Sequence, residues 1–339
     1  MKFKVHTITA ATLALLFILA RAPALASQEK PDRPPWAQPG GTPQSQPAPA
    51  PPKEDAQETA SPRNTVKVHV NLVNVLVSVL DEHNRPAPNL PVEGFQILEE
   101  GVQQKIDIFE PETQLPLDIA LMIDSSLSAH MEKLSEQDAA SRFIQQVLRP
   151  EDRLSVFCFD EQVRQLAPYF SDDIPALQAA VRKIPDGAGT SIYDAVFLGS
   201  DALLKRKGER RRVIIMVTDA GETTSHYDFD AARKAALRAG ILLYTIVIRP
   251  VKNENGRNTA GEHALQTITE TTGGAMFFPD SSQELPVIFD RIDSELRTQY
   301  RLAYYPNPRG PVNSYRTIEV KVLPGYTARH RTSYLTGPQ

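Results

Sequence analysis

The chain has 339 residues, of which 41% are hydrophobic and 23% are charged, a composition typical of a soluble globular protein. This length allows about two domains with a sizeable buried core. The formal net charge of −4 argues against a basic nucleic-acid-binding surface. The single cysteine, Cys158, excludes an intramolecular disulfide framework and a cysteine-rich zinc site.

Residues 1–26 have the pattern of an export signal. Lys2 and Lys4 precede an apolar run over residues 8–20, and residues 24–26 supply a small-residue cleavage site. The run is short for a helix that must cross ~30 Å of hydrocarbon, although an uncleaved N-terminal anchor is the alternative. No later stretch is apolar enough to span a membrane. We therefore predict an exported protein that is periplasmic, secreted or held at the cell surface.

Residues 27–64 hold ten of the 28 prolines and almost no aliphatic side chains. Such a segment cannot bury enough apolar surface to offset the entropy that ordering would cost. We predict that it is a disordered, proline-rich linker.

Two β-rich segments flank the rest of the chain. In residues 65–113, alternating valines over 66–79 predict a first strand, and residues 95–99 and 105–109 predict two more. Toward the C-terminus, strands are expected at 300–305, 317–322 and 326–334. Fewer than about fifty residues form a marginal sheet. We therefore expect residues 65–113 and 302–339 to pack together as one small sandwich.

The middle of the chain, residues 114–301, alternates apolar strands with amphipathic helices. Continuous apolar runs such as residues 117–123 are typical of strands buried on both faces of a parallel sheet. The alternation predicts a doubly wound α/β domain with a mostly parallel sheet flanked by helices. Ligands of such domains bind beyond the carboxyl ends of the strands. Strands are expected at 117–123, 153–159, 163–170, 212–218, 241–248 and 275–278, and helices at 140–148, 174–184, 192–204, 231–239, 262–271 and 285–296.

Polar residues gather where three loops are expected to meet at that edge. An Asp-x-Ser-x-Ser pattern follows the strand at 117–123, a glycine-rich loop precedes the helix at 192–204, and an aspartate follows the strand at 212–218. These loops offer only oxygen donors, a set suited to Mg²⁺, Mn²⁺ or Ca²⁺. With only two acids in the set, a bound cation can also accept an acidic group from a partner. The candidate metal ligands are Asp124, Ser126, Ser128, Thr190 and Asp219.

This pattern resembles the metal-ion-dependent adhesion site of the von Willebrand factor A family, a Rossmann-like fold. The resemblance covers roughly residues 115–301. It implies that Ser126, Ser128 and Thr190 contact the ion and that the two aspartates often act through water. Asp219 is followed by alanine, where glycine is common in the family. The β-rich ends, with Tyr-Arg-Leu-Ala-Tyr-Tyr-Pro at 300–306, resemble a bacterial exported subgroup known from Acidobacteria.

The leading hypothesis is therefore a non-enzymatic adhesion-type module that captures a carboxylate of a protein or glycan through a divalent cation. One alternative is a structural envelope component in which the metal only stabilises the fold. The other is a metal-assisted hydrolase that uses Asp124 or His130. The site lacks the histidines or further carboxylates that usually activate water, and no nucleophile elbow accompanies His130. Nucleic acid is not an expected partner.

Several polar residues near these loops allow a structural interpretation. Serine and aspartate at a strand–helix junction also cap helices, which is the alternative for Asp124 or Ser128 taken singly. Glu222 and Asp194 are expected either to support the metal ligands from behind or to tune the charge near the site. The basic residues at 205–207 and 210–212 are interpreted as a solvated turn, with phosphate or anionic lipid binding as the alternative.

Overall fold

A six-stranded sheet forms the centre of the α/β part of the protein. The computed structural model describes residues 72–111, 113–126, 133–248 and 258–336, all within the unit Val66–Gln339. The strand order is β10-β9-β8-β5-β6-β7, and every neighbouring pair is parallel except β6 and β7. The strands are β5 (Leu117–Asp124), β6 (Arg153–Phe159), β7 (Val163–Ser171), β8 (Arg211–Thr218), β9 (Ile241–Val247) and β10 (Met276–Phe277).

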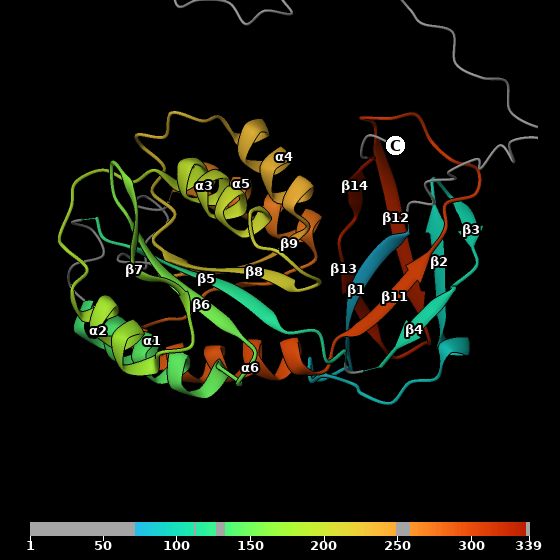
Figure 1. Cartoon of the computed structure of the whole chain (residues 1–339), viewed down its shortest axis with the longest axis horizontal. Helices are drawn as coiled ribbons and strands as arrows, with labels where there is room; N and C mark the ends of the chain where they lie inside the picture. The colour runs from blue at the N-terminus through green and yellow to red at the C-terminus, as the bar shows by residue number, and fades with distance from the viewer. Residues whose placement is uncertain (1–71, 112, 127–132, 249–257, 337–339) are drawn as a thin grey trace, which may run out of the picture. The chain divides into compact units, whose positions relative to one another are not determined.

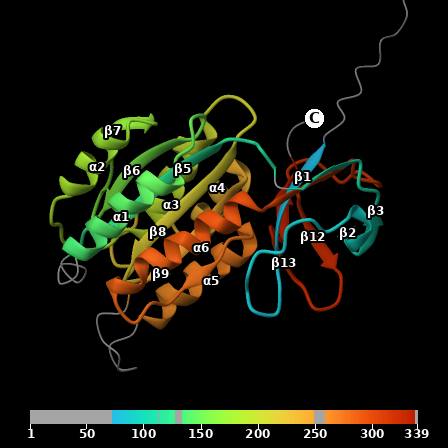
Figure 2. The same cartoon turned by 90° about the horizontal axis from the view of Figure 1, so that it is seen from below.

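Helices cover both faces of this sheet (Figure 1). The helices α1 (Lys133–Val147), α2 (Ile174–Arg182) and α6 (Leu285–Arg297) cover one face, which Figure 2 shows from below. The helices α3 (Ile192–Leu204), α4 (Phe229–Ala239) and α5 (Thr259–Thr272) cover the other. Successive residues of β5 alternate between the two cores, with Leu121 in the first and Met122 in the second. Burial on both faces accounts for the continuous apolar strands, and the predicted doubly wound α/β class is confirmed.

A second set of strands forms two four-stranded sheets, ordered β13-β1-β11-β4 and β14-β12-β2-β3. Both sheets combine strands from the two ends of the described chain. In the first, Val75 of β1 pairs with Leu302 of β11, and in the second, Ile97 of β2 pairs with Val320 of β12. Their inward side chains form one apolar core, which we call the sandwich core. The strands are β1 (Val73–Leu80), β2 (Phe95–Glu99), β3 (Val102–Gln104), β4 (Ile108–Glu110), β11 (Tyr300–Tyr304), β12 (Tyr315–Val322), β13 (Thr327–His330) and β14 (Ser333–Leu335).

The prediction of one strand over residues 105–109 is wrong. β3 ends at Gln104 and pairs with β2, whereas β4 begins at Ile108 and pairs with β11 in the other sheet. The chain therefore crosses between the two sheets over residues 105–107. A short stretch with alternating apolar residues does not by itself show which sheet it joins.

Within the basic cluster at 205–212, Lys205 and Lys207 are exposed, as expected for a solvated turn, but the arginines are held by the fold. Arg206 and Arg210 donate from Nε to the fully buried Asp118, at 3.0 and 2.7 Å. Arg211 is 3% exposed and donates to the backbone carbonyls of Leu115 and Leu296. The partners lie about 85 to 96 positions away in the sequence, so local composition could not reveal them.

The predicted export signal, the proline-rich linker and residues 66–71 of the first predicted strand lie outside the described residues. Within the four described ranges, no helix combines the length and the apolar character that crossing a membrane requires.

Candidate metal centre

Three loops meet at the carboxyl edge of the six-stranded sheet. β5 and β8 are adjacent parallel strands, so Asp124 at the end of β5 and Asp219 just after β8 emerge at the same edge. The Gly187 amide donates to the carbonyl of Ser125 at 2.8 Å. The amides of Thr223 and Thr224 donate to the carbonyl of Thr190 at 2.9 and 3.2 Å. The loop before α3 is therefore held between the other two loops.

Asp124 is a buried carboxylate without a cationic partner. Its side chain accepts hydrogen bonds from the Thr218 hydroxyl at 2.7 Å and from the Ser126 amide at 3.0 Å. The pKa of Asp124 is raised from 3.8 to about 6, chiefly by burial, and the nearby Asp219 also raises it. The hydrogen bonds from Thr218, from the Ser126 amide and from the Ser126 hydroxyl lower it. No Lys, Arg or His among the described residues forms an ion pair with Asp124. A positive charge placed here would stabilise the ionised form.

Asp219 and Thr190 each keep polar atoms that face this edge. Asp219 is half-buried and accepts the Gly221 amide at 2.9 Å through only one of its carboxylate oxygens. The intervening Ala220 has a φ of 63°, a left-handed conformation that favours glycine. Glycine is the residue common at this position in the family that the sequence resembles. The Thr190 amide donates to the Thr223 hydroxyl, and the Thr190 carbonyl accepts from two amides. Its own hydroxyl makes no hydrogen bond to any residue the structure describes.

The structure brings four of the five predicted ligands to one place. These are Asp124, Ser126, Thr190 and Asp219. Ser128 and His130 lie outside the described residues. Over the described part of the chain, no three His, Cys, Asp or Glu side chains cluster as metal ligands would. A cation at this edge would therefore rely on hydroxyl oxygens in addition to Asp124 and Asp219, which fits the hard-donor chemistry of Mg²⁺, Mn²⁺ or Ca²⁺.

The sequence analysis missed Asp160, which reaches the same edge after β6. Its side chain is buried, forms an ion pair with Arg164 and lies 3.4 Å from the Ser125 hydroxyl. Because Arg164 neutralises this acid, Asp160 supports the loop rather than offering a free carboxylate. The position of Asp160 directly after a predicted strand could have revealed it, since the residue after any parallel strand reaches the carboxyl edge of the sheet.

Glu222 and Asp194 hold backbone turns in place, which agrees with the supporting role rather than with charge tuning alone. Glu222 accepts the Ile192 amide at 2.7 Å and the Ser225 hydroxyl at 2.8 Å, so it caps the start of α3 just beyond Thr190. Asp194 accepts the amides of His226 and Tyr227 at 2.9 and 2.8 Å. These contacts fix the loop that carries Asp219 against the helix that follows Thr190.

Cys158 lies in the apolar core on the first face of the sheet, as expected for a small core residue. Burial raises the pKa of its thiol, which favours the neutral form. This cysteine therefore has no part in the chemistry of the carboxyl edge.

Comparison with known proteins identifies part of the chain. Residues 119–222 match the family model of the von Willebrand factor type A domain, so the chain contains such a domain. No curated protein matches the chain in sequence. Similar solved structures include a von Willebrand factor type A protein from Catenulispora acidiphila, at 10% identity over 80% of this chain and 76% of that chain, with a TM-score of 0.48.

Two further structures match about half of the chain. The conserved hypothetical protein BatB from Bacteroides thetaiotaomicron is 19% identical over 53% of this chain and 98% of that chain, with a TM-score of 0.43. The vWF domain of the type V pili tip protein Mfa5 from Porphyromonas gingivalis is 12% identical over 53% of this chain and 95% of that chain, with a TM-score of 0.42.

Proposed function

We propose that this von Willebrand factor type A domain is the binding part of an exported adhesion-type protein, which captures an acidic group of a protein or glycan through a divalent cation. The cation would be held by Asp124, Ser126, Ser128, Thr190 and Asp219. It would supply the positive charge to which the partner's carboxylate binds. Export rests on the pattern of residues 1–26.

The observation that carries this proposal is the state of Asp124. A carboxylate that is 4% exposed normally has a cationic partner, since removing an unpaired charge from water is costly. Here its hydrogen-bond donors are two hydroxyls and a backbone amide, and the charge that acts on it is that of a second acid, Asp219. Two acids and a free threonine hydroxyl at one edge therefore form a set that a divalent cation would complete.

The composition of the set also favours binding over catalysis. Serine and threonine hydroxyls are neutral ligands, so two carboxylates leave a divalent cation with remaining affinity for an anion. A partner's carboxylate would meet that need, and the interaction would disappear when the cation is chelated. A binding role also agrees with von Willebrand factor type A domains being generally interaction modules.

The test has two steps that separate cation binding from partner capture. Isothermal titration of the full chain with Mg²⁺, Mn²⁺ or Ca²⁺ should show saturable binding that Asp124→Ala abolishes. Immobilised chain should then retain carboxylate-bearing proteins or acidic glycans in the presence of the cation and release them in EDTA. Thr190→Ala should weaken both steps, whereas the matched variant Thr190→Ser keeps the hydroxyl and should preserve them.

The outcomes distinguish the competing functions. If no cation binds at the Asp124 edge, the proposed site is wrong. If a cation binds but no carboxylate-bearing partner is retained in an EDTA-reversible manner, the structural role in the envelope replaces the adhesion role.

A further inference from the structure

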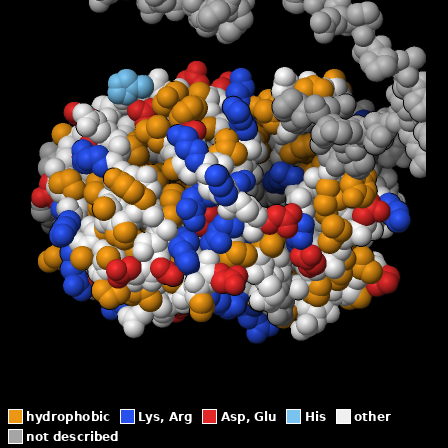
Figure 3. Space-filling view, in the orientation of Figure 1, with side chains coloured by type: hydrophobic (Ala, Val, Ile, Leu, Met, Phe, Trp, Pro, Cys, Tyr) orange, Lys and Arg blue, Asp and Glu red, His pale blue; other side chains and the backbone are white. Residues whose placement is uncertain are grey.

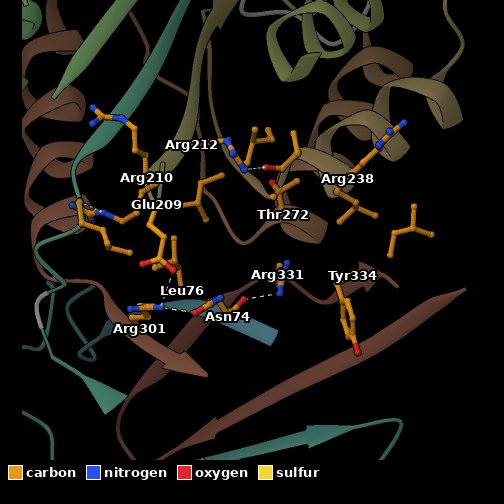
Figure 4. A pocket seen from close by; sticks show the side chains of 18 of the residues that line it. Asn74, Leu76, Glu209, Arg210, Arg212, Arg238, Thr272, Arg301, Arg331 and Tyr334 are labelled. Carbon is orange, nitrogen blue, oxygen red and sulfur yellow. Dashed lines mark hydrogen bonds and ion pairs between the residues drawn. The ribbon is translucent and has the colours of Figure 1, made fainter. Parts of the chain in front are cut away.

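A second candidate site lies at the opposite edge of the six-stranded sheet. A cleft of about 420 Å³ opens where the amino ends of β8 and β9 and the end of α4 face the strands of the sandwich (Figure 4). Its α/β wall includes Arg212, Leu237 and Leu242, and its sandwich wall includes Leu76 and Arg331. Because these are the beginnings of the parallel strands, the cleft is separate from the candidate metal centre, which lies at their ends.

Arginine dominates the charge of this cleft. Only one acid, Glu209, is among the residues that line it. Figure 3 shows Lys and Arg side chains gathered over the boundary between the α/β part and the sandwich. The lining arginines are Arg210, Arg211, Arg212, Arg238, Arg301 and Arg331.

Two of these arginines are neutralised by acids. Arg210 pairs with Asp118 at 2.7 Å, and Arg301 pairs with Glu110 at 3.0 Å. Glu209 is 74% exposed and lies 3.8 Å from Arg301, so it sits at the rim. Within the described ranges, none of the other four lining arginines forms an ion pair with a carboxylate. The cleft therefore carries a surplus of positive charge.

The two arginines that face each other across the cleft contact neutral groups only. Arg212 donates to the carbonyl of Ala239 at 3.0 Å and also approaches the carbonyl of Arg206, while Arg331 donates to the carbonyl of Asn74. The Nε atoms of Arg212 and Arg331 are buried and have no hydrogen-bond acceptor. Burial lowers the pKa of both guanidinium groups, as expected for positive charges with too little compensation. An anion between the walls would place negative charge close to both guanidinium groups.

The shape and chemistry of the lining indicate the class of anion. Guanidinium groups bind phosphate and carboxylate with paired hydrogen bonds, and a planar carboxylate is satisfied by one arginine. A phosphate dianion has oxygens directed to several sides and can accept from arginines on both walls. Leu76, Leu237 and Leu242, with the ring of Tyr334, add an apolar surface that suits an organic group. The volume lies in the range of small-molecule sites.

We propose that this cleft binds a small organic phosphate, with Arg212 and Arg331 donating to the phosphate from opposite walls. Such a ligand would connect the sandwich to the amino edge of the α/β sheet. Binding would not require the divalent cation, because none of the candidate metal ligands lines the cleft.

The experiment is isothermal titration of the full chain with inorganic phosphate, glycerol 3-phosphate and succinate, in EDTA and at constant ionic strength. Both phosphates should bind saturably, and succinate should bind more weakly. Arg331→Gln and Arg212→Gln should each weaken phosphate binding about 10- to 100-fold, as expected for loss of a charge-assisted hydrogen bond. Arg309→Gln removes the same charge at an exposed position outside the cleft and should bind like the wild type.

Arg238→Gln keeps the test valid if Arg212→Gln or Arg331→Gln fails to fold. Arg238 is exposed and makes no hydrogen bond within the described residues, so its replacement should leave the fold intact and weaken phosphate binding to a smaller extent. Asp124→Ala should bind phosphate like the wild type. The proposal is overturned if neither phosphate binds saturably, if succinate alone binds, or if Arg212→Gln and Arg238→Gln bind phosphate unchanged.

Discussion

The two edges of the six-stranded sheet surround their buried acids differently. At the amino edge, the fully buried Asp118 lies between Arg206 and Arg210. At the carboxyl edge, Asp124 is almost as buried, but two hydroxyls and an amide are its donors and Asp219 is its charged neighbour. A buried charge is tolerated when it is paired and costly when it is not. Asp118 is thus part of the folded framework, whereas Asp124 forms no ion pair with a cationic side chain of the described residues.

The same contrast applies to the positive charges. Arg206 and Arg210 have their acid within the fold, but Arg212 and Arg331 contact backbone carbonyls instead. Each edge thus has charged side chains that form ion pairs within the fold and others that form none among the described residues. The comparison can be tested by removing charges at each edge in turn.

Removing the paired acid should have the largest effect. Asp118→Asn leaves the guanidinium groups of Arg206 and Arg210 without their counter-ion, and we expect the free energy of unfolding to fall by about 3–5 kcal/mol. Urea denaturation followed by circular dichroism measures this change. Asp201→Asn, which removes the exposed partner of Lys205, is the control and should cost less than about 1 kcal/mol. Equal losses for the two variants would contradict the structural role of Asp118.

Removing the unpaired acid should have the opposite sign when no cation is present. Because the pKa of Asp124 is raised to about 6, the native state binds this proton more tightly than the unfolded state does. Its contribution to stability is present at low pH and is lost as the pH rises toward and through 6. In EDTA at pH 7.5, Asp124→Asn should therefore unfold at a higher urea concentration than the wild type. Its free energy of unfolding should be higher by up to about 3 kcal/mol.

At pH 4 the gain of Asp124→Asn should largely vanish, because the wild-type carboxyl is then protonated in the folded protein. Glu82→Gln, at an exposed position, should show neither the gain nor its pH dependence. A loss of stability in Asp124→Asn at pH 7.5 would show that the carboxylate already has compensation within the fold.

A divalent cation should stabilise the wild type through the same carboxylate. Binding to the native state at a hundredfold excess over Kd adds about 2.7 kcal/mol. For a chain of this size that corresponds to about 2–4 °C in Tm per kcal/mol. Asp124→Ala should lose the shift. In the wild type the shift should decrease as the pH falls through about 6, because a proton competes for Asp124. Identical melting curves in Mg²⁺, Mn²⁺, Ca²⁺ and EDTA would argue against the site.

Loosening the support of the carboxyl edge should have an intermediate effect. Glu222→Ala removes the side chain that accepts the Ile192 amide at the start of α3 and holds Ser225. We expect a loss of about 1–2 kcal/mol in urea denaturation, as for other helix caps, with weaker cation binding in titration. Phosphate binding at the opposite edge should not change, and a change there would mean that the two edges are coupled.

The smallest effect on stability should come from Thr190. Its hydroxyl makes no hydrogen bond to the residues described, so Thr190→Ala in EDTA should alter the free energy of unfolding by less than about 1 kcal/mol. The same variant should nevertheless bind the cation more weakly, while Thr190→Ser binds it like the wild type. A large destabilisation of Thr190→Ala in EDTA would assign the hydroxyl a structural role instead.

Local pattern by itself predicted the order of strands and helices. Continuous apolar runs identified β5, β8 and β9, and helical spacing identified α1 and α6, because burial on a sheet or a helix face repeats over a few residues. The pattern also placed Asp124, Thr190 and Asp219 at one edge, since parallel strands share the edge at which their carboxyl ends emerge. The limits of this logic appear at residues 105–109, where alternation could not show that the chain changes sheets.

Only the tertiary structure decided which charges meet. Asp118 lies 88 and 92 positions from its two arginines, and Glu222 reaches a helix that begins thirty residues earlier in the chain. Arg331 reaches the backbone of Asn74 across 257 positions. No short-range periodicity encodes such pairs. They follow from how the sheet, its helices and the sandwich pack, and this packing decides which buried charges form an ion pair within the described residues and which do not.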